Sequence, residues 1–97
     1  MKRVLVVDDD EAVRLLYLEE LREAGYLVEV AADGAEALRM IRETRPDLVT
    51  IDLKMPGMDG IELLGHVRHL HRDLPIVIST AYGDLRRDFG TWAGDAY

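Results

Sequence analysis

The chain contains no cysteine, which excludes a disulfide framework and any metal site built on thiolate ligands. It also lacks a long hydrophobic run. The apolar stretch behind the charged start is only Val4 to Val7, too short for a signal peptide or a membrane span. These two absences favour a cytoplasmic protein with no membrane segment.

Positive charge is scarce as well. Lysine and arginine together number 12, against 19 aspartates and glutamates, and the formal net charge is −7. A chain this acidic is repelled by a phosphate backbone, so direct nucleic-acid binding is not expected. A basic partner or a divalent cation would suit it better.

What the chain does contain is enough for one folded domain. Its 97 residues are 48% hydrophobic and 32% charged, which supports both a core and a soluble surface. Chains divide into several domains only well above this length, and disorder requires a more polar composition. We therefore expect a single domain over residues 1–97.

Apolar runs and amphipathic runs alternate along this domain. Helical spacing of apolar residues predicts helices, with Gly25 and Pro46 as stops for the first two. Short aliphatic runs between them predict strands, because buried parallel strands are apolar on both faces. The helices are expected at 10–24, 34–43, 61–70 and, more weakly, 84–93, and the strands at 3–7, 27–32, 48–51 and 76–79, with the start of a fifth at 96–97.

Strand–helix alternation of this kind predicts an α/β fold, a doubly wound parallel sheet with helices on both faces. The strand order that we expect for it is the flavodoxin-like order 2-1-3-4. In such sheets the functional site lies beyond the carboxyl ends of the strands. Three predicted strands run into polar residues at that end, namely Asp8-Asp9, Asp52 and Ser79-Thr80.

In a sheet of this order, the ends of the first and third strands are neighbours. Asp8, Asp9 and Asp52 would then converge, and three crowded carboxylates repel one another unless a cation lies among them. Mg²⁺ suits the position, since it binds through one or two carboxylates and keeps water for phosphate oxygens. The backbone carbonyl of Lys54 is a further candidate ligand.

Asp52 also suits covalent chemistry, because a carboxylate can attack phosphorus and form an aspartyl-phosphate. Thr80 would lie where its hydroxyl can hydrogen-bond the phosphoryl group. The simpler alternative is that Asp8 to Glu11 only begins a helix, with carboxylates capping free amides. Asp10 is expected to serve as that cap in either case.

Three segments of the chain resemble the receiver domain of bacterial response regulators. They are Val6 to Asp10, Asp47 to Gly60 with its Asp-x-x-Met-Pro-x-x-Asp-Gly pattern, and Pro75 to Ala81. The resemblance implies a signalling domain in which Asp52 takes a phosphoryl group from a sensor histidine kinase or phosphotransfer protein. Such a domain catalyses only its own phosphorylation and dephosphorylation.

The same resemblance implies a set of site residues. Asp8 and Asp9 would hold Mg²⁺ together with Asp52, Thr80 would be the switch hydroxyl, and Tyr97 would be the aromatic switch residue. The residues expected to flank the pocket are Lys54, Ala81 and Tyr82.

The family normally continues past Tyr97 with most of a fifth strand, a lysine of the site and a last helix. Lys2 and Lys54 are the only lysines here. We therefore expect an impaired switch and an open sheet edge, with Leu15 and Leu18 as exposed apolar residues. Exposed edges favour a homo-oligomer or exchange of elements between chains. The alternative function is a non-signalling, self-associating fragment of the receiver fold.

Two other interpretations carry less support. A phosphatase of the haloacid dehalogenase type would use Asp8-x-Asp10, but it wants Thr or Val where Ala12 stands. The spacing of His66 and His69 permits a metal site, yet no carboxylate joins them at ligand spacing. Surface histidines are the expected role.

Overall fold

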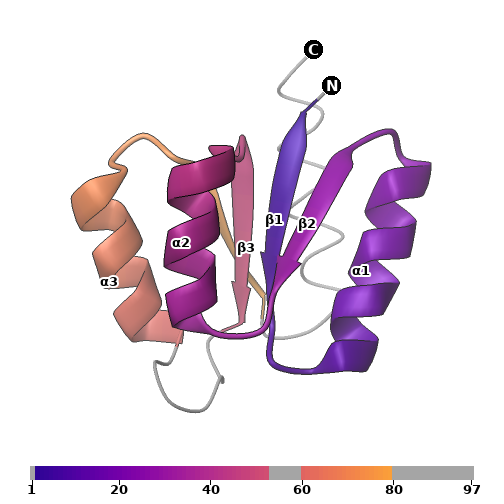
Figure 1. Cartoon of the computed structure of the whole chain (residues 1–97), viewed down its shortest axis with the longest axis horizontal. Helices are drawn as coiled ribbons and strands as arrows, with labels where there is room; N and C mark the ends of the chain where they lie inside the picture. The colour runs from indigo at the N-terminus through magenta and orange to yellow at the C-terminus, as the bar shows by residue number, and fades with distance from the viewer. Residues whose placement is uncertain (1, 53–59, 80–97) are drawn as a thin grey trace.

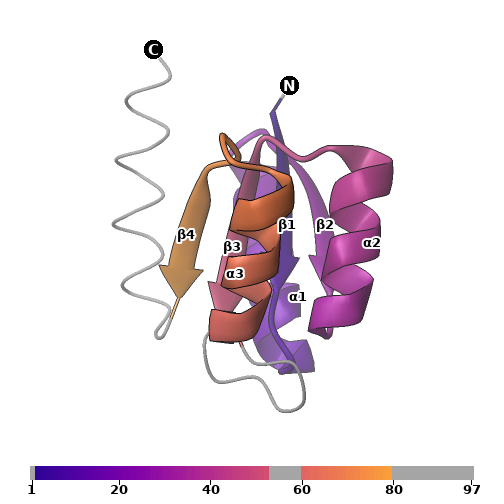
Figure 2. The same cartoon turned by 90° about the vertical axis from the view of Figure 1, so that its left-hand side faces the viewer.

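The computed structural model of this protein describes residues 2–52 and 60–79. Its sheet has four parallel strands in the order β2-β1-β3-β4 (Figures 1 and 2). The strands are β1 (Arg3–Val7), β2 (Leu27–Ala31), β3 (Leu48–Asp52) and β4 (Ile76–Ser79). The predicted α/β fold and strand order are thus confirmed. The expected helix at 84–93 and fifth strand at 96–97 lie outside the described residues.

Helices cover both faces of the sheet. Figure 1 shows α1 (Glu11–Glu23) on one face, with α2 (Gly34–Thr44) and α3 (Gly60–Leu70) on the other. Side chains of β1 alternate between the two resulting cores: Leu5 and Val7 join the core under α2 and α3, and Val4 and Val6 join the core under α1. All four are at most 1% exposed, which explains why the strand is apolar at every position.

The predicted element boundaries agree with the observed ones to within about one residue, with two helix starts set by aspartate caps. Asp10 caps α1 by accepting hydrogen bonds from the amides of Ala12 (2.9 Å) and Val13 (3.2 Å). Asp33 caps α2 by accepting from the amide of Glu36 at 2.8 Å. These carboxylates satisfy amides that the first helical turn leaves free.

The two helix ends differ in chemistry. Gly25 follows α1 with φ of 97°, the left-handed conformation that glycine adopts freely. Arg45 adopts the same region, with φ of 50°, at the end of α2. A non-glycine residue there costs about 1–2 kcal/mol, and Pro46 prevents the helix from continuing in any case.

The apolar positions that recur at helical spacing in the first helix are only partly buried, and they are Val13, Leu16, Tyr17, Leu21 and Ala24. Tyr17 and Leu21 are buried, but Leu16 is 40% exposed and Ala24 is exposed. Leu15 is 52% exposed as expected, whereas Leu18 is partly buried and packs against the core, so the expectation that it is exposed is wrong. The helix lies against a twisted sheet, so the contact line drifts away from the ideal helical stripe.

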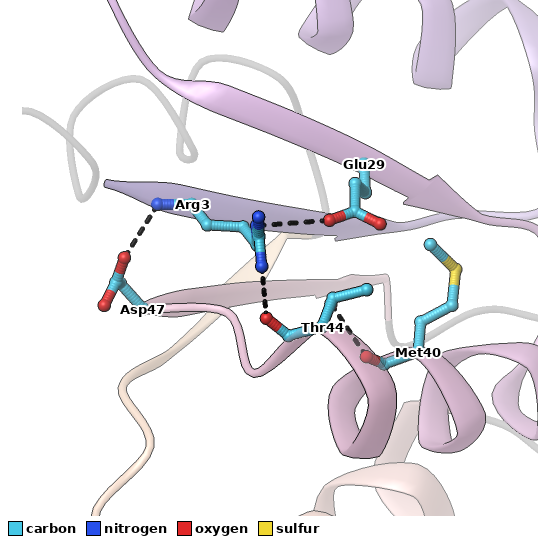
Figure 3. Close-up of polar contacts among 5 residues, drawn as sticks. All are labelled: Arg3, Glu29, Met40, Thr44 and Asp47. Carbon is cyan, nitrogen blue, oxygen red and sulfur yellow. Dashed lines mark hydrogen bonds and ion pairs between the residues drawn. The ribbon is translucent and has the colours of Figure 1, made fainter. Parts of the chain in front are cut away.

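Arg3 ties the amino end of β1 to two other elements (Figure 3). Its backbone amide donates to Asp47 Oδ2 at 2.7 Å, and its guanidinium donates to the carbonyl oxygen of Thr44 at 2.5 Å. The guanidinium also lies 3.3 Å from Glu29 Oε1 of β2. The Thr44 hydroxyl donates in turn to the Met40 carbonyl at 2.8 Å. One side chain therefore joins β1, β2 and the last turn of α2.

Arg3→Ala is expected to lower the free energy of unfolding by about 1–3 kcal/mol, because a helix-terminal carbonyl loses its charged donor. Urea denaturation measures the change. The matched control is Arg39→Ala, which removes an exposed ion pair with Glu43 at 3.0 Å and should cost no more than about 0.5 kcal/mol. Equal losses in the two variants would contradict the proposed role of Arg3.

Candidate functional site

The carboxyl ends of β1 and β3 are adjacent in the sheet. Val7 pairs with Ile51, so Asp8 and Asp52 extend from neighbouring strands at the same edge. One carboxylate oxygen each from Asp8, Asp9 and Asp52 lies within 4.8 Å of the other two. The sequence-based expectation that these three side chains converge therefore agrees with the geometry. We refer to them as the acidic cluster.

The three carboxylates differ in exposure, and Asp8 is the deepest. It is 6% exposed, Asp52 is partly buried and Asp9 is exposed. The backbone of Asp8 is fixed at both polar atoms: its amide donates to the Ala31 carbonyl at 3.1 Å, and its carbonyl accepts from the Arg14 guanidinium at 2.8 Å. The cluster is therefore built on a rigid strand end.

Burial raises the pKa of the Asp8 carboxyl above its ordinary value. A hydrogen bond from the Asp10 amide to Asp8 Oδ1, 2.9 Å long, acts in the opposite direction. The charges of Asp52, Asp9 and Asp10 raise the pKa further. The ionised cluster is thus unfavourable by itself, and a divalent cation among the carboxylates would relieve both the burial and the repulsion.

The residues present fit a magnesium ion. Carboxylate oxygens are the ligands that Mg²⁺ prefers, and Asp9 leaves the cluster open to solvent for the water that this ion retains. The fit requires nothing from Asp10, whose side chain faces the first turn of α1 as its cap.

Asp10→Ala is expected to lower the free energy of unfolding by about 0.5–2 kcal/mol through loss of that cap. The stabilisation produced by Mg²⁺ should remain, because the acidic cluster is intact. Thermal unfolding with and without Mg²⁺ measures both effects, and Asp10→Ser, which keeps a capping oxygen, is the control. Loss of the magnesium response in Asp10→Ala would assign this residue to the cluster instead.

The other predicted site residues lie outside the described part of the chain: Thr80, Tyr97, Lys54, Ala81 and Tyr82. The register between β3 and β4 does locate Ser79, the last described residue before Thr80. This residue pairs with Asp52 across β3 and β4. The end of β4 therefore lies beside the end of β3, at the edge of the sheet that carries the acidic cluster.

Sequence reasoning missed Arg14, whose guanidinium holds the Asp8 carbonyl. A lone arginine in the first turns of a helix gave no signal of that contact. His66 and His69 are exposed on α3, and among the described residues the acidic cluster alone groups at least three possible metal ligands. The histidines thus behave as the sequence suggested.

Fold and acidic cluster together define a doubly wound α/β domain with a carboxylate site at the strand ends. The chain matches the family model of the response regulator receiver domain over residues 4–89. The protein therefore belongs to the response regulator receiver domain family, as its sequence motifs suggested.

Curated relatives agree with this assignment. Sporulation initiation phosphotransferase F of Bacillus subtilis is 42% identical over 84 residues, which cover 87% of this chain and 68% of that protein. Response regulator MprA of Mycobacterium ulcerans is 49% identical over 79 residues, 81% of this chain and 34% of that protein. The chain thus spans about two thirds of the first relative and one third of the second.

Solved structures share the fold. The response regulator protein TrrA of Thermotoga maritima, in complex with Mg²⁺-BeF, is 44% identical with a TM-score of 0.80, over 96% of this chain and 81% of that one. TrrA in the complex with histidine kinase ThkA is 45% identical with a TM-score of 0.79, over 84% of this chain and 71% of that one. A phosphoacceptor role fits these comparisons, and they give no support to a non-signalling fragment.

Proposed function

We propose that Asp52 accepts a phosphoryl group from a histidine kinase or phosphotransfer protein, assisted by Mg²⁺ bound at Asp8, Asp9 and Asp52. The observation that carries this proposal is the convergence of the three carboxylates within 4.8 Å. A single partly buried aspartate at a strand end would be a turn residue. Beside two further acids, it becomes a nucleophile with a metal site next to it.

Each acid of the cluster has a separate part in this chemistry. An oxygen of Asp52 attacks phosphorus, and the bond between phosphorus and the donor nitrogen breaks, leaving an acyl phosphate on Asp52. Asp8 and Asp9 would hold Mg²⁺ by their carboxylates, and Asp8 is fixed in place through its backbone. The ion, when bound, would supply positive charge beside the phosphoryl oxygens.

Residues outside the described part of the chain complete the proposal through the family resemblance. The carbonyl of Lys54 would be a further metal ligand, Thr80 would donate its hydroxyl to the phosphoryl group, and Tyr97 would respond to that contact. Ala81 and Tyr82 would line the pocket. In this scheme the domain acts on no substrate beyond its own phosphoryl group.

The class of protein that we propose as the phosphoryl donor is suggested by the complex of a related response regulator. TrrA of Thermotoga maritima has been solved in complex with a histidine kinase, and this chain is 45% identical to it. We propose a kinase of that class, and a cytoplasmic location for the exchange. No helix in the described residues has the length and apolar content needed to cross a membrane.

Treatment with acetyl phosphate tests the function directly. The intact mass should increase by one phosphoryl group when Mg²⁺ is present and stay unchanged in EDTA. Incorporation that is equal with and without the metal would contradict the proposed role of the acidic cluster.

We further propose that the protein self-associates through the β4 side of the sheet. In the described sheet β4 is an edge strand (Figure 2). Its Ile78 is 38% exposed. Exposed edges promote pairing between chains, and a charge on the edge opposes it. Sedimentation should detect a dimer that Ile78→Lys weakens. A monomer at all concentrations would overturn the proposal.

A further inference from the structure

The end of the sheet opposite the acidic cluster carries a depression of about 410 Å³. It lies between the last turn of α2 and the loop from α3 to β4, at the upper ends of both helices in Figure 1. Its floor is apolar and its rim is basic. The floor consists of Ile41, Pro46 and Leu74, and the rim consists of Arg42, Arg45 and His71. We call it the basic depression.

The two arginines of the basic depression have no acidic partner among the described residues. Neither Arg42 nor Arg45 makes an ion pair with another residue that the structure describes, and no described acidic residue lines the depression. A second depression, beside β2, shows the contrast. Its lining includes Arg3 and Glu29, whose charged groups lie 3.3 Å apart. The cations of the basic depression therefore remain available to a ligand.

The attraction between a cation and the carboxyl end of a helix could explain one arginine at the end of α2, but it does not explain two. The carboxyl end of a helix carries roughly half a negative charge, which one guanidinium already exceeds. Arg42 occupies the last turn of α2 and Arg45 its end. Together they leave an excess of positive charge on a chain whose net charge is −7.

Arg45 is also held in an unfavourable backbone conformation. Its φ of 50° is the region where helix ends normally use glycine, as α1 does with Gly25. In this conformation arginine is less favourable than glycine, and the Arg45 side chain lines the basic depression. An unfavourable backbone conformation at a residue that lines the basic depression points to a role for its side chain.

We propose that the basic depression binds a small organic anion, independently of the function assigned to Asp52. The carboxylate or phosphate monoester group of this anion is held by Arg42 and Arg45, because guanidinium groups pair with both kinds of oxyanion. Its apolar body lies over Ile41, Pro46 and Leu74. The volume falls within the range of small-ligand pockets.

Amide chemical-shift titration of the full chain with phenyl phosphate tests the assignment, in a buffer freed of divalent metal beforehand so that the acidic cluster stays empty and no chelator competes for the arginines. Saturable shifts are expected at residues 41–45 and 71–74. Inorganic phosphate should bind several-fold more weakly, because it lacks the apolar body. Shifts that do not saturate, or equal binding of the two probes, would overturn the proposal.

Two variants separate binding from folding. Arg42→Gln and Arg45→Gly should each weaken phenyl phosphate binding about tenfold. Arg45→Gly should unfold at an equal or higher temperature, since glycine relieves the left-handed conformation. Arg22→Gln, in the last turn of α1 on the other face of the sheet, is the matched control and should bind normally. Unchanged binding in both depression variants would contradict the site.

A protein segment is the competing occupant. A blocked peptide of alternating glutamate and leucine presents the same two chemistries on a chain. If it shifts the same amides at lower concentration than phenyl phosphate does, the basic depression contacts an acidic protein surface. The small-molecule assignment would then be overturned.

Discussion

Asp52→Asn is expected to abolish phosphoryl incorporation from acetyl phosphate. The amide nitrogen and oxygen that replace the carboxylate cannot form an acyl phosphate under these conditions, so the loss should be complete. Intact mass after incubation with Mg²⁺ measures it. Because Asp52 lies at the end of β3 and is only partly buried, the variant should fold normally.

Asp47→Asn is the matched control for this substitution. It makes the same chemical change one residue before the other end of the same strand, where the side-chain oxygen accepts from the Arg3 amide. Asparagine retains that acceptor, so the variant should still be phosphorylated. Residual incorporation in Asp52→Asn at the wild-type level would show that another residue accepts the phosphoryl group.

Asp8→Asn is expected to stabilise the metal-free protein and to remove most of the stabilisation that Mg²⁺ produces. In EDTA at neutral pH, the variant should be more stable than the wild type, because a buried charge beside two others is removed. The gain should be about 1.4 kcal/mol for each unit by which folding raises the Asp8 pKa. For a domain of this size each kcal/mol shifts Tm by about 4–8 °C. Mg²⁺ at a hundred times its Kd should raise wild-type stability by about 2.7 kcal/mol and the variant far less.

The pH dependence of this difference has a defined sign. The folded-state pKa of Asp8 is raised above 3.8, so the folded protein holds that proton more tightly than the unfolded chain. Metal-free stability therefore falls as pH rises from the unfolded value through the folded one. Below about pH 3.8 both states are protonated, and the advantage of Asp8→Asn should vanish.

Asp33→Asn is the control for that series. It neutralises another aspartate that closely follows a strand, but this one caps a helix and its carboxylate is not part of the acidic cluster. It should show neither the gain in EDTA nor the loss of the magnesium response. The same gain in both variants would mean that net charge, rather than the cluster, controls stability.

Much of the fold could be predicted from sequence because each signal was local. The apolar run of β1, the Asp10 cap and the Gly25 stop each depend on a few neighbouring residues, and all have the predicted structure. The acidic cluster could also be predicted, since a parallel sheet places the ends of β1 and β3 side by side. In both cases the rule links neighbours in the chain or in the sheet.

Contacts set by the angle between helix and sheet could not be predicted in this way. Leu16 fits the helical spacing yet is 40% exposed, while Leu18 falls off the stripe and packs against the core. The Arg14 contact with Asp8 and the three-way contact of Arg3 also depend on side-chain reach across elements. The spacing of apolar residues along a helix does not show how far a side chain extends toward another element.

Titration with Mn²⁺, which shares the preference of Mg²⁺ for oxygen ligands, probes directly whether the acidic cluster binds a divalent ion. Paramagnetic broadening should first remove the amide signals at residues 8–10 and 52, at less than one equivalent, and excess Mg²⁺ should restore them. Asp9→Asn should require much more Mn²⁺ for the same broadening. Broadening that spreads over many acidic surface residues, or that leaves position 52 untouched, would contradict a metal site at the acidic cluster.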